Sequence, residues 1–346
     1  MTSQAAEKYD FETGIYRPPS EGGSYSLLVR FTRNCPWNRC EFCAMYKNEK
    51  FELRSVDEIK QDIDNIAAFC RDIQKNGRAD RDALVELIRR NPDLNYHQGV
   101  AMVYHWLLAG GKTVFVQDAN SMIMPTNQLV EVLQHLRTTF PSIERVTTYA
   151  RSKTVSQKKL EELISIREAG LERLHMGLET GDDELLKKMK KGVTAEGHIK
   201  GGRMAMEAGF QVSEYWMPGL GGQQMWEQHA VNTARTLNQI NPHYIRSRPF
   251  YPIPGTPLAA AVEKGEIQLL SGHGVLHELK RMVQELDVTS HVCFDHAGNY
   301  WTDRRGNLVF THNYEGYKFP EDKQKVLDRI EEGLLVDNER PAMLNL

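Results

Sequence analysis

The sequence has no long apolar run, no large excess of one charge and no fourth cysteine close to its cysteine cluster. No stretch reaches the roughly 18 apolar residues that span a bilayer, and no signal peptide precedes the cluster, so we expect a cytoplasmic protein without a membrane partner. The 43 basic and 46 acidic residues give a net charge of −3, which provides no general attraction for nucleic acid. Nucleic acid is therefore not an expected partner.

Length and composition are those of an ordinary globular protein. Of the 346 residues, 40% are hydrophobic and 26% are charged, which is enough to build a large core. At about 150 residues per domain the chain would form two domains, but α/β barrels of about 200 to 250 residues also fold as one unit. One barrel with an extension therefore fits the length.

Three of the five cysteines, Cys35, Cys40 and Cys43, lie within nine positions. An odd cysteine count in a reducing compartment argues against disulfides. Zinc would need a remote fourth ligand, because the next cysteine is Cys70 and the next histidine is His97. Three thiolates on a four-iron cubane leave one iron open, which is what a reactive site needs. We predict a [4Fe–4S] cluster, with structural zinc as the alternative.

The other two cysteines have simpler interpretations. Cys70 continues the apolar helical face of Val56, Ile59, Ile63 and Ile66, which indicates a buried core thiol. Cys293 lies near His291 and His296, and these three side chains could bind a second metal. Packing is the favoured interpretation, because a single thiol flanked by histidines on a strand is more often packed than ligating.

Apolar runs followed by helical patterns predict an α/β fold with parallel strands and right-handed crossovers, a partial (β/α)6 TIM-like barrel. The predicted strands are 25–32, 113–120, 145–150, 172–178, 211–217 and 244–250. We expect a lead-in at residues 1–24, the barrel at 25–258 with a helical insertion at about 71–110, and an α+β C-terminal extension at 259–346. Helices are expected at 79–90 and 97–108 in the insertion, and a hairpin around Arg305 and Gly306 in the extension.

In such a barrel the functional groups gather at the carboxyl ends of the strands. The cysteines follow the first predicted strand, and Asp118 closes the second. Tyr149 and Ser152 follow the third, and Glu179 closes the fourth. We therefore expect these side chains to meet the cysteines at one end of the barrel.

These features resemble the radical S-adenosylmethionine (SAM) superfamily, whose loop after the first barrel strand carries three cysteines with an aromatic residue just before the last. Phe42 occupies that aromatic position. The spacing here is Cys-x4-Cys-x2-Cys, one residue longer in the first gap than the common Cys-x3-Cys-x2-Cys. The resemblance covers residues 25–258 and is closest to the branch that includes the MiaB, NifB and Elongator catalytic-subunit domains.

The resemblance implies a set of SAM contacts. Glu179 would contact the ribose, and the turn that begins at Met217 and the segment that begins at Tyr251 would contact the adenine. Asp118 would bind the SAM amino group or else be a structural strand-end acid. His198 would bind the SAM carboxylate or else be a solvated helix histidine. Arg248 would pair with the same carboxylate or bridge an acid of the barrel.

The family resemblance also implies an enzyme that cleaves SAM reductively to a 5′-deoxyadenosyl radical, which abstracts hydrogen from an unidentified small-molecule substrate. An electron donor such as flavodoxin or ferredoxin would be a partner. The alternative is a non-catalytic iron–sulfur or tetrapyrrole-carrying chaperone on the same barrel. The aromatic-rich segment His291–Tyr317 either lines the substrate pocket, with His296 and Asn299 exposed there, or only seals the barrel.

Overall fold

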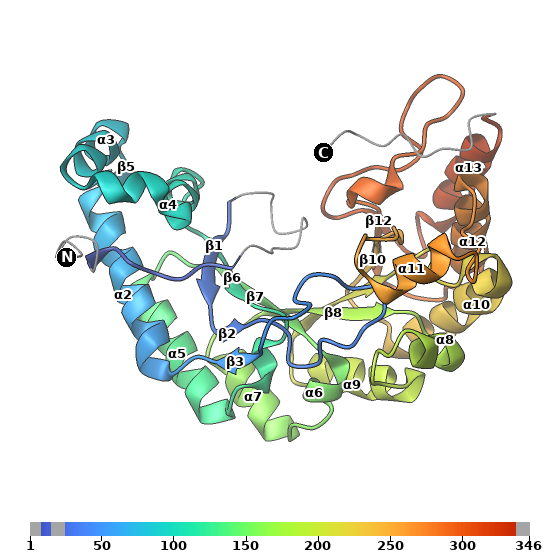
Figure 1. Cartoon of the computed structure of the whole chain (residues 1–346), viewed down its shortest axis with the longest axis horizontal. Coiled ribbons are helices and arrows are strands. Elements are labelled where there is room, and N and C mark those ends of the chain that lie inside the picture. Colours follow the sequence, from blue (N-terminus) through green and yellow to red (C-terminus); the bar gives the residue numbers. More distant parts are fainter. Residues whose placement is uncertain (1–7, 15–24, 337–346) are drawn as a thin grey trace.

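The computed structural model describes residues 8–14 and 25–336, and most of the predicted lead-in lies outside these ranges. One eight-stranded sheet forms the inner layer of a crescent-shaped molecule (Figure 1). Its strands, in spatial order, are β1 (Leu27–Arg30), β6 (Thr113–Gln117), β7 (Arg145–Ala150), β8 (Arg173–Glu179), β9 (Gln211–Trp216), β10 (Tyr244–Ser247), β11 (His291–Cys293) and β12 (Tyr317–Lys318). The first seven run parallel, and β12 pairs antiparallel with β11.

The sheet is an open, partial barrel, because its edge strands β1 and β12 each pair with one neighbour only. The six predicted strands correspond to β1 and β6 to β10, so the predicted α/β class and parallel order are confirmed. Strand β11 is a seventh parallel strand that the sequence interpretation missed. Buried runs such as Leu27–Val29 and Val114–Val116 explain why these strands lie in the inner layer, since parallel strands are covered on both faces.

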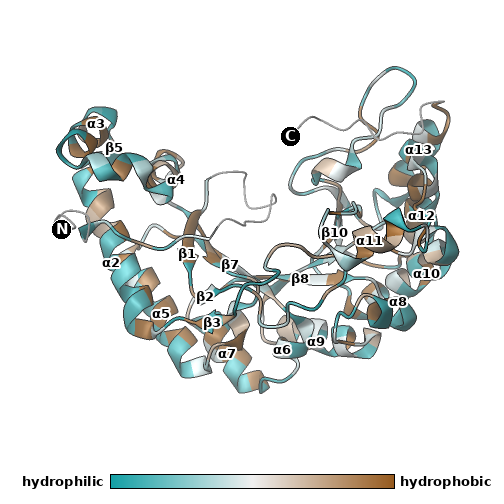
Figure 2. Cartoon of the chain, in the orientation of Figure 1, coloured by the Kyte–Doolittle hydropathy of each residue, from teal (hydrophilic) through white to brown (hydrophobic). Residues whose placement is uncertain are grey.

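Helices cover the convex side of the sheet, with their apolar faces toward it (Figure 2). They are α2 (Val56–Asp72), α5 (Thr126–Thr139), α6 (Ser152–Val155), α7 (Leu160–Glu168), α8 (Asp183–Lys188), α9 (Ala195–Glu207), α10 (Gly222–Ile240), α12 (Gly272–Glu285) and α13 (Lys323–Leu334). The short helix α11 (Pro257–Glu263) begins at the cysteine loop, where the Leu258 N–H donates to the Glu41 carbonyl. Single 3-10 turns occur at η2 (Ser121–Ile123) and η3 (Ala297–Asn299). No helix in the described part of the chain is both long and apolar enough to cross a membrane.

Helix α2 shows how the sequence sets these elements. Ser55 caps its first turn in a reciprocal capping box with Glu58. Ile59 and Ile63 are fully buried, and each such burial contributes about 1.5–3 kcal/mol. Cys70 is buried on the same face, and burial raises the pKa of its thiol to about 12, so its predicted place in the core is confirmed.

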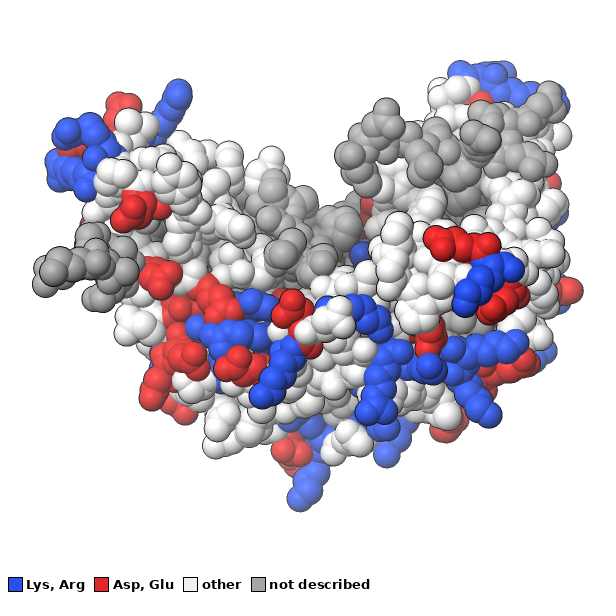
Figure 3. Space-filling view, in the orientation of Figure 1, with Lys and Arg blue, Asp and Glu red and all other residues white. Residues whose placement is uncertain are grey.

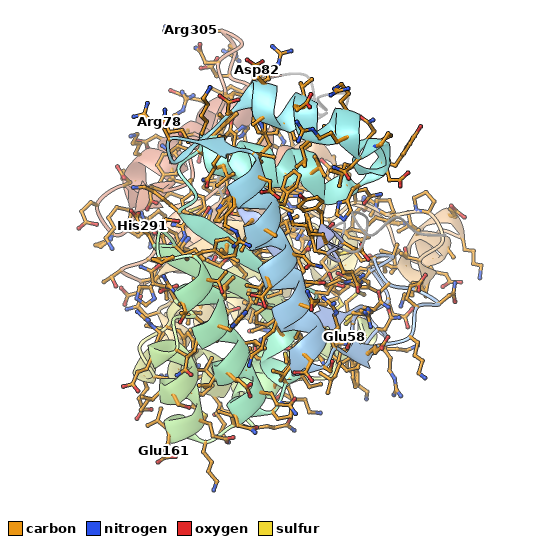
Figure 4. The ribbon with its side chains drawn as sticks, turned by 90° about the vertical axis from the view of Figure 1, so that its left-hand side faces the viewer. Glu58, Arg78, Asp82, Glu161, His291 and Arg305 are labelled. Atoms are coloured by element: carbon orange, nitrogen blue, oxygen red, sulfur yellow. The ribbon has the colours of Figure 1, made fainter. Side chains whose placement is uncertain are left out.

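The insertion after α2 has the two predicted helices. A short hairpin of β4 (Gln74–Lys75) and β5 (Arg78–Ala79) leads into α3 (Arg81–Arg90), η1 (Pro92–Tyr96) and α4 (Gln98–Leu108). In the side view of Figure 4, Glu58 lies at the lower end of α2, while Arg78 and Asp82 lie at the top. Helix α3 has no fully buried side chain, as expected of a surface helix.

The C-terminal extension is continuous with the barrel. Helices α12 and α13 pack against α10 and against each other, and one apolar cluster joins Trp216 and Ile245 of the barrel to Leu279 and Phe294 of the extension. The predicted hairpin around Arg305 is confirmed by the antiparallel bridge between Thr302 and Leu308.

This shared core predicts cooperative unfolding. We expect Leu279→Ala to lower the free energy of unfolding by about 2–5 kcal/mol, because Leu279 is fully buried between the two parts. Leu308→Ala is the control, since Leu308 is exposed and should change stability by about 0.5 kcal/mol or less. Urea unfolding followed by circular dichroism measures both. Two separated transitions in the wild-type protein would contradict a common core.

Candidate cofactor site

The cysteine loop begins where β1 ends and is closed at its base by a two-stranded ribbon. Strand β2 (Thr32–Arg33) pairs antiparallel with β3 (Glu52–Leu53). Asn34 and Asn38 have positive φ, a conformation that asparagine tolerates better than most residues. The Asn38 N–H donates to Cys35 Sγ at 3.4 Å. The ribbon and these turns bring Cys35, Cys40 and Cys43 to the same cavity, where each is half-buried.

This cavity of about 390 Å³ lies at the carboxyl ends of the strands. The predicted residues that line it are Cys35, Phe42, Cys40, Cys43, Tyr149, Glu179, Met217, Arg248 and Tyr251. His296, predicted for a possible substrate pocket, also lines this cavity. The sequence interpretation missed further lining residues, namely Trp37, Tyr46, Arg151, His175, Lys191 and Tyr215. The three cysteines and six of the nine predicted SAM contacts therefore share one space.

The three thiols fit an iron–sulfur cluster by their chemistry. All five cysteines are free, and burial raises the pKa of Cys40 and of Cys43 in the metal-free chain. Within the described ranges, no three His, Cys, Asp or Glu side chains are placed to hold a single metal ion. A cubane cluster binds one thiolate per iron, so its ligands need not converge on one point.

Glu179 and Lys191 form a largely buried ion pair beside these thiols. Lys191 Nζ lies 2.8 Å from Glu179 Oε1, and both side chains are about nine-tenths buried, with 12% and 13% of their surfaces exposed. Gly177 leaves room for the pair in this position, because a Cβ there would lie 2.3 Å from Glu179 Oε1 and 3.0 Å from Lys191 Nζ. Burial opposes the charge of Lys191, but Glu179 and Cys40 outweigh it and raise its pKa, so the ammonium stays charged.

Lys191 was missed because it is one of several lysines that follow the acidic start of α8, a charge order that the helix dipole favours. The structure separates them. Lys187 and Lys188 end the helix at its surface, whereas Lys191 lies after the last turn and points back into the cavity. The signal in the sequence was Gly192, whose φ of +75° lets the chain reverse direction directly after Lys191.

Arg151 is a second cation near the cysteines. Its Nη2 donates to the Lys191 carbonyl at 2.7 Å, which ties the end of β7 to the segment after α8. Burial lowers the pKa of Arg151, and the nearby Cys35 and Cys40 act in the opposite direction. Two cations therefore lie close to thiols that would be negatively charged when bound to metal.

The lining near Arg248 is also polar, and Glu179 is the one carboxylate in the lining of the cavity. Burial opposes the charge of Arg248, but Tyr149, Tyr215 and Glu179 outweigh it and raise its pKa, with Tyr149 also hydrogen-bonded to the guanidinium. His296 contributes from the C-terminal extension, and burial together with Arg248 lowers its pKa to about 4. At neutral pH this part of the cavity holds one cation and a neutral imidazole.

Three predicted SAM contacts lie outside the cavity lining. Asp118 is buried in an ion pair with Arg30, whose Nε lies 2.7 Å from Oδ2, and the same oxygen accepts the Asn34 N–H at 3.0 Å. Ser152 Oγ lies 2.7 Å from His198 Nδ1, and both residues are buried. The SAM-binding roles of these residues stay predictions, but the interpretation of His198 as a solvated histidine does not match its burial.

Burial also sets the protonation of His198. Desolvation, with added repulsion from the charges of Lys191 and Arg151, holds the pKa of His198 well below its ordinary value. The imidazole is therefore neutral at physiological pH. It shares a hydrogen bond with Ser152 but has no positive charge with which to attract an anion.

The turn that begins at Met217 is held by two buried groups that the sequence did not reveal. His229 of α10 hydrogen-bonds the Met217 carbonyl at 3.1 Å through Nε2 and Thr180 Oγ1 at 2.8 Å through Nδ1. Glu278 of α12 accepts the Gly219 N–H. Burial lowers the pKa of His229 to about 4 and raises the pKa of Glu278 to about 8, so both are neutral at pH 7.

The aromatic-rich segment of the extension differs from expectation. Asn299 is fully buried and exchanges two hydrogen bonds of 2.9 Å with Ser247, so its predicted exposure is wrong. The Cys293 thiol donates to the carbonyls of His291 and Tyr314, and burial raises its pKa to about 12. These contacts are those of a packed core thiol.

The central part of the chain is similar to known proteins. Residues 99–234 match the family model described as the Radical SAM superfamily. The chain is similar to 3-methylornithine synthase of Methanosarcina barkeri (28% identical over 123 residues, 35% of this chain) and to the heme chaperone HemW of Bacillus subtilis (26% over 129 residues, 37% of this chain). Each match spans 34% of the relative's own length.

Two solved structures give a wider but weaker likeness. A methylornithine synthase (PylB) structure aligns with 95% of this chain and 76% of its own, at 16% identity and a TM-score of 0.45. The coproporphyrinogen III oxidase HemN of Escherichia coli aligns with 75% of this chain and 51% of its own, at 17% identity and a TM-score of 0.46.

The family match begins after the cysteine loop, so it is independent of the cysteine motif. It covers strands β6 to β9 and the helices between them, which carry Asp118, Tyr149, Glu179 and most of the cavity wall outside the cysteine loop. Residues 99–234, less than half of the chain, are therefore similar to the Radical SAM superfamily.

Proposed function

We propose that the protein is a radical SAM enzyme that acts on an unidentified small-molecule substrate. Members of the superfamily use a [4Fe–4S] cluster and SAM. When bound, these groups supply reductive cleavage of SAM and a 5′-deoxyadenosyl radical that abstracts hydrogen. The observation that carries the proposal is the cavity itself, because Cys35, Cys40 and Cys43 face the same space as Glu179 and Met217.

In this proposal the protein's own groups fix charge and position. The three cysteines hold three irons, while Lys191 and Arg151 offset the negative charge of the thiolates. Glu179 accepts hydrogen bonds from the ribose hydroxyls, and its ion pair with Lys191 orients the carboxylate for this contact.

The remaining predicted contacts divide into direct and supporting roles. Phe42, Tyr149, Arg248 and Tyr251 reach the cavity and are proposed SAM contacts, with Arg248 as the partner of the SAM carboxylate. Other groups act through the backbone or a neighbour. Asp118 holds the first residue of the cysteine loop, and the Ser152–His198 pair packs next to Arg151.

Free thiols and an electron-consuming reaction suggest a reducing, cytoplasmic setting with a flavodoxin or ferredoxin as electron donor. Similarity to a heme chaperone keeps a second function open, a tetrapyrrole-carrying protein on the same barrel. Anaerobic formation of 5′-deoxyadenosine from SAM distinguishes the two. An increase in yield on adding a cell extract supports an enzyme, and haem binding without SAM cleavage supports a carrier.

The first site prediction concerns the cluster. Cys35→Ala, Cys40→Ala and Cys43→Ala should each lose bound iron, because only these cysteines face the cavity. Cys70→Ala and Cys293→Ala are the controls and should keep it. Iron analysis with Mössbauer or EPR spectra measures occupancy. Full occupancy in all three loop variants would remove the cysteines from the site.

The second site prediction concerns Glu179. Glu179→Ala should weaken SAM binding about ten- to a hundredfold, since losing a hydrogen bond to a charged group costs about 1.5–3 kcal/mol, and the cluster should remain. Glu184→Ala, on the exposed face of α8, is the matched control. Anaerobic calorimetry gives both affinities. Wild-type affinity in the Glu179 variant would contradict the ribose contact.

A third site prediction concerns the support of the Met217 turn. Glu278→Ala leaves the Gly219 N–H without its acceptor, which costs about 1–3 kcal/mol, and should weaken SAM binding. Glu278→Gln imitates the protonated carboxyl and should retain the affinity. Burial raises the pKa of Glu278 from 4.5 to about 8, so the folded protein keeps a proton that the unfolded chain loses above pH 4.5. The free energy of unfolding should therefore fall as the pH rises from about 4.5 to 8. The Gln variant should lack this decrease. Equal SAM affinity in the Ala variant would show that the turn does not need this contact.

A further inference from the structure

A second hollow, of about 680 Å³, lies beside the cysteine loop on the outer surface. Its lining comes from the cysteine loop, α6, the end of α8 and the start of α9. The aromatic and basic residues of this lining are Trp37, Arg39, Lys153, Lys187 and Lys190. It is separate from the cofactor cavity, but Trp37 lines both.

The hollow is strongly basic although the chain as a whole carries a net charge of −3. Arg39, Lys153, Lys187 and Lys190 are exposed, and Asp183 is the one acid in the lining. Lys190 pairs with Glu41, whereas Arg39, Lys153 and Lys187 form no ion pair with any described residue. Figure 3 shows Lys and Arg side chains gathered on this side of the molecule, over α8 and α9.

The Trp37 side chain lies between the basic hollow and the cofactor cavity and is held in place by its neighbours. Its Nε1 donates to the Lys190 carbonyl at 2.7 Å, and its ring packs so closely on Gly192 that a Cβ there would lie 2.3 Å away. The guanidinium of Arg151 lies 4.8 Å from the ring centroid. Trp37 belongs to the four residues between Cys35 and Cys40, so a molecule seated in the hollow would touch the loop that carries the cluster ligands.

We propose that this basic hollow is the docking surface for an acidic one-electron carrier, a small flavin or iron–sulfur protein. The proposal rests on the proposed function, which requires one external electron for each SAM cleaved. One electron leaves the reduced carrier, which is oxidised, and enters the cluster, which is reduced, with no bond made or broken in that step. Clustered positive charge speeds the encounter with an acidic partner and fixes its orientation.

The test uses the cluster-loaded full chain and a flavodoxin as the probe. The double variant Lys153→Glu/Lys187→Glu reverses two exposed charges of the hollow. The matched control Lys264→Glu/Lys325→Glu reverses two exposed charges elsewhere. Anaerobic calorimetry measures binding of flavodoxin, and stopped-flow absorbance measures reduction of the cluster by photoreduced flavodoxin and, separately, by dithionite, which needs no docking surface.

At low ionic strength we expect the hollow variant to bind flavodoxin about tenfold or more weakly and to be reduced correspondingly more slowly. The control variant should stay within about twofold of wild type, and dithionite should reduce all three proteins equally. High salt should remove the difference in flavodoxin binding between the wild type and the hollow variant, because salt screens the interactions between exposed charges.

Equal binding and reduction by flavodoxin in the hollow variant would overturn the docking surface while leaving the proposed function intact. RNA binding that the same variant abolishes, with flavodoxin reduction unchanged, would overturn it in favour of a nucleic-acid surface. A wild-type chain that holds no cluster, or that cleaves no SAM with dithionite, would overturn the proposed function and the docking surface together.

Discussion

Balancing buried negative charge is the constraint on which the site depends. Cysteine binds metal as the thiolate, and burying three thiolates is costly unless cations lie beside them. Burial is the largest cause that raises the pKa of Cys40 and of Cys43, so these two residues are thiols in the metal-free chain. Lys191 and Arg151 supply the positive charge, and Glu179 keeps Lys191 charged in turn. The ion pair therefore links the cluster ligands to the proposed ribose contact.

The backbone around the cavity is organised to keep these groups in place. The carbonyl of Lys191 accepts Arg151, and the carbonyl of Lys190 accepts Trp37, so one short segment after α8 fixes both the end of β7 and the cysteine loop. The interior of a helix could not present two successive carbonyls in this way, because its carbonyls bond within the helix. The chain reversal at Gly192 makes the segment available.

The C-terminal extension does more than the sequence suggested. The sequence left two roles open for it, lining a substrate pocket or sealing the barrel. The structure adds a contact to the proposed adenine turn, where Glu278 of α12 accepts the Gly219 N–H. His296, from the same extension, lines the cavity next to Arg248. Strand β11 explains why, because it extends the sheet by one parallel strand and carries the extension to the mouth of the cavity. The barrel and the extension therefore share both the apolar core and the lining of the cavity.

The sequence by itself determined the features that depend on local spacing. Apolar periodicity predicted the parallel strands β1 and β6 to β10 and the apolar face of α2 with Cys70. The cysteine spacing predicted that Cys35, Cys40 and Cys43 share one site, and all three line the same cavity. Only the tertiary structure decided the contacts between residues far apart, such as Glu278 with Gly219, His229 with Thr180, and Ser152 with His198. It also decided that Lys191 points inward while Lys187 stays at the surface. The physical reason is that periodicity and capping are encoded within a few residues, whereas the partner of a buried charge is set by which elements the sheet brings side by side.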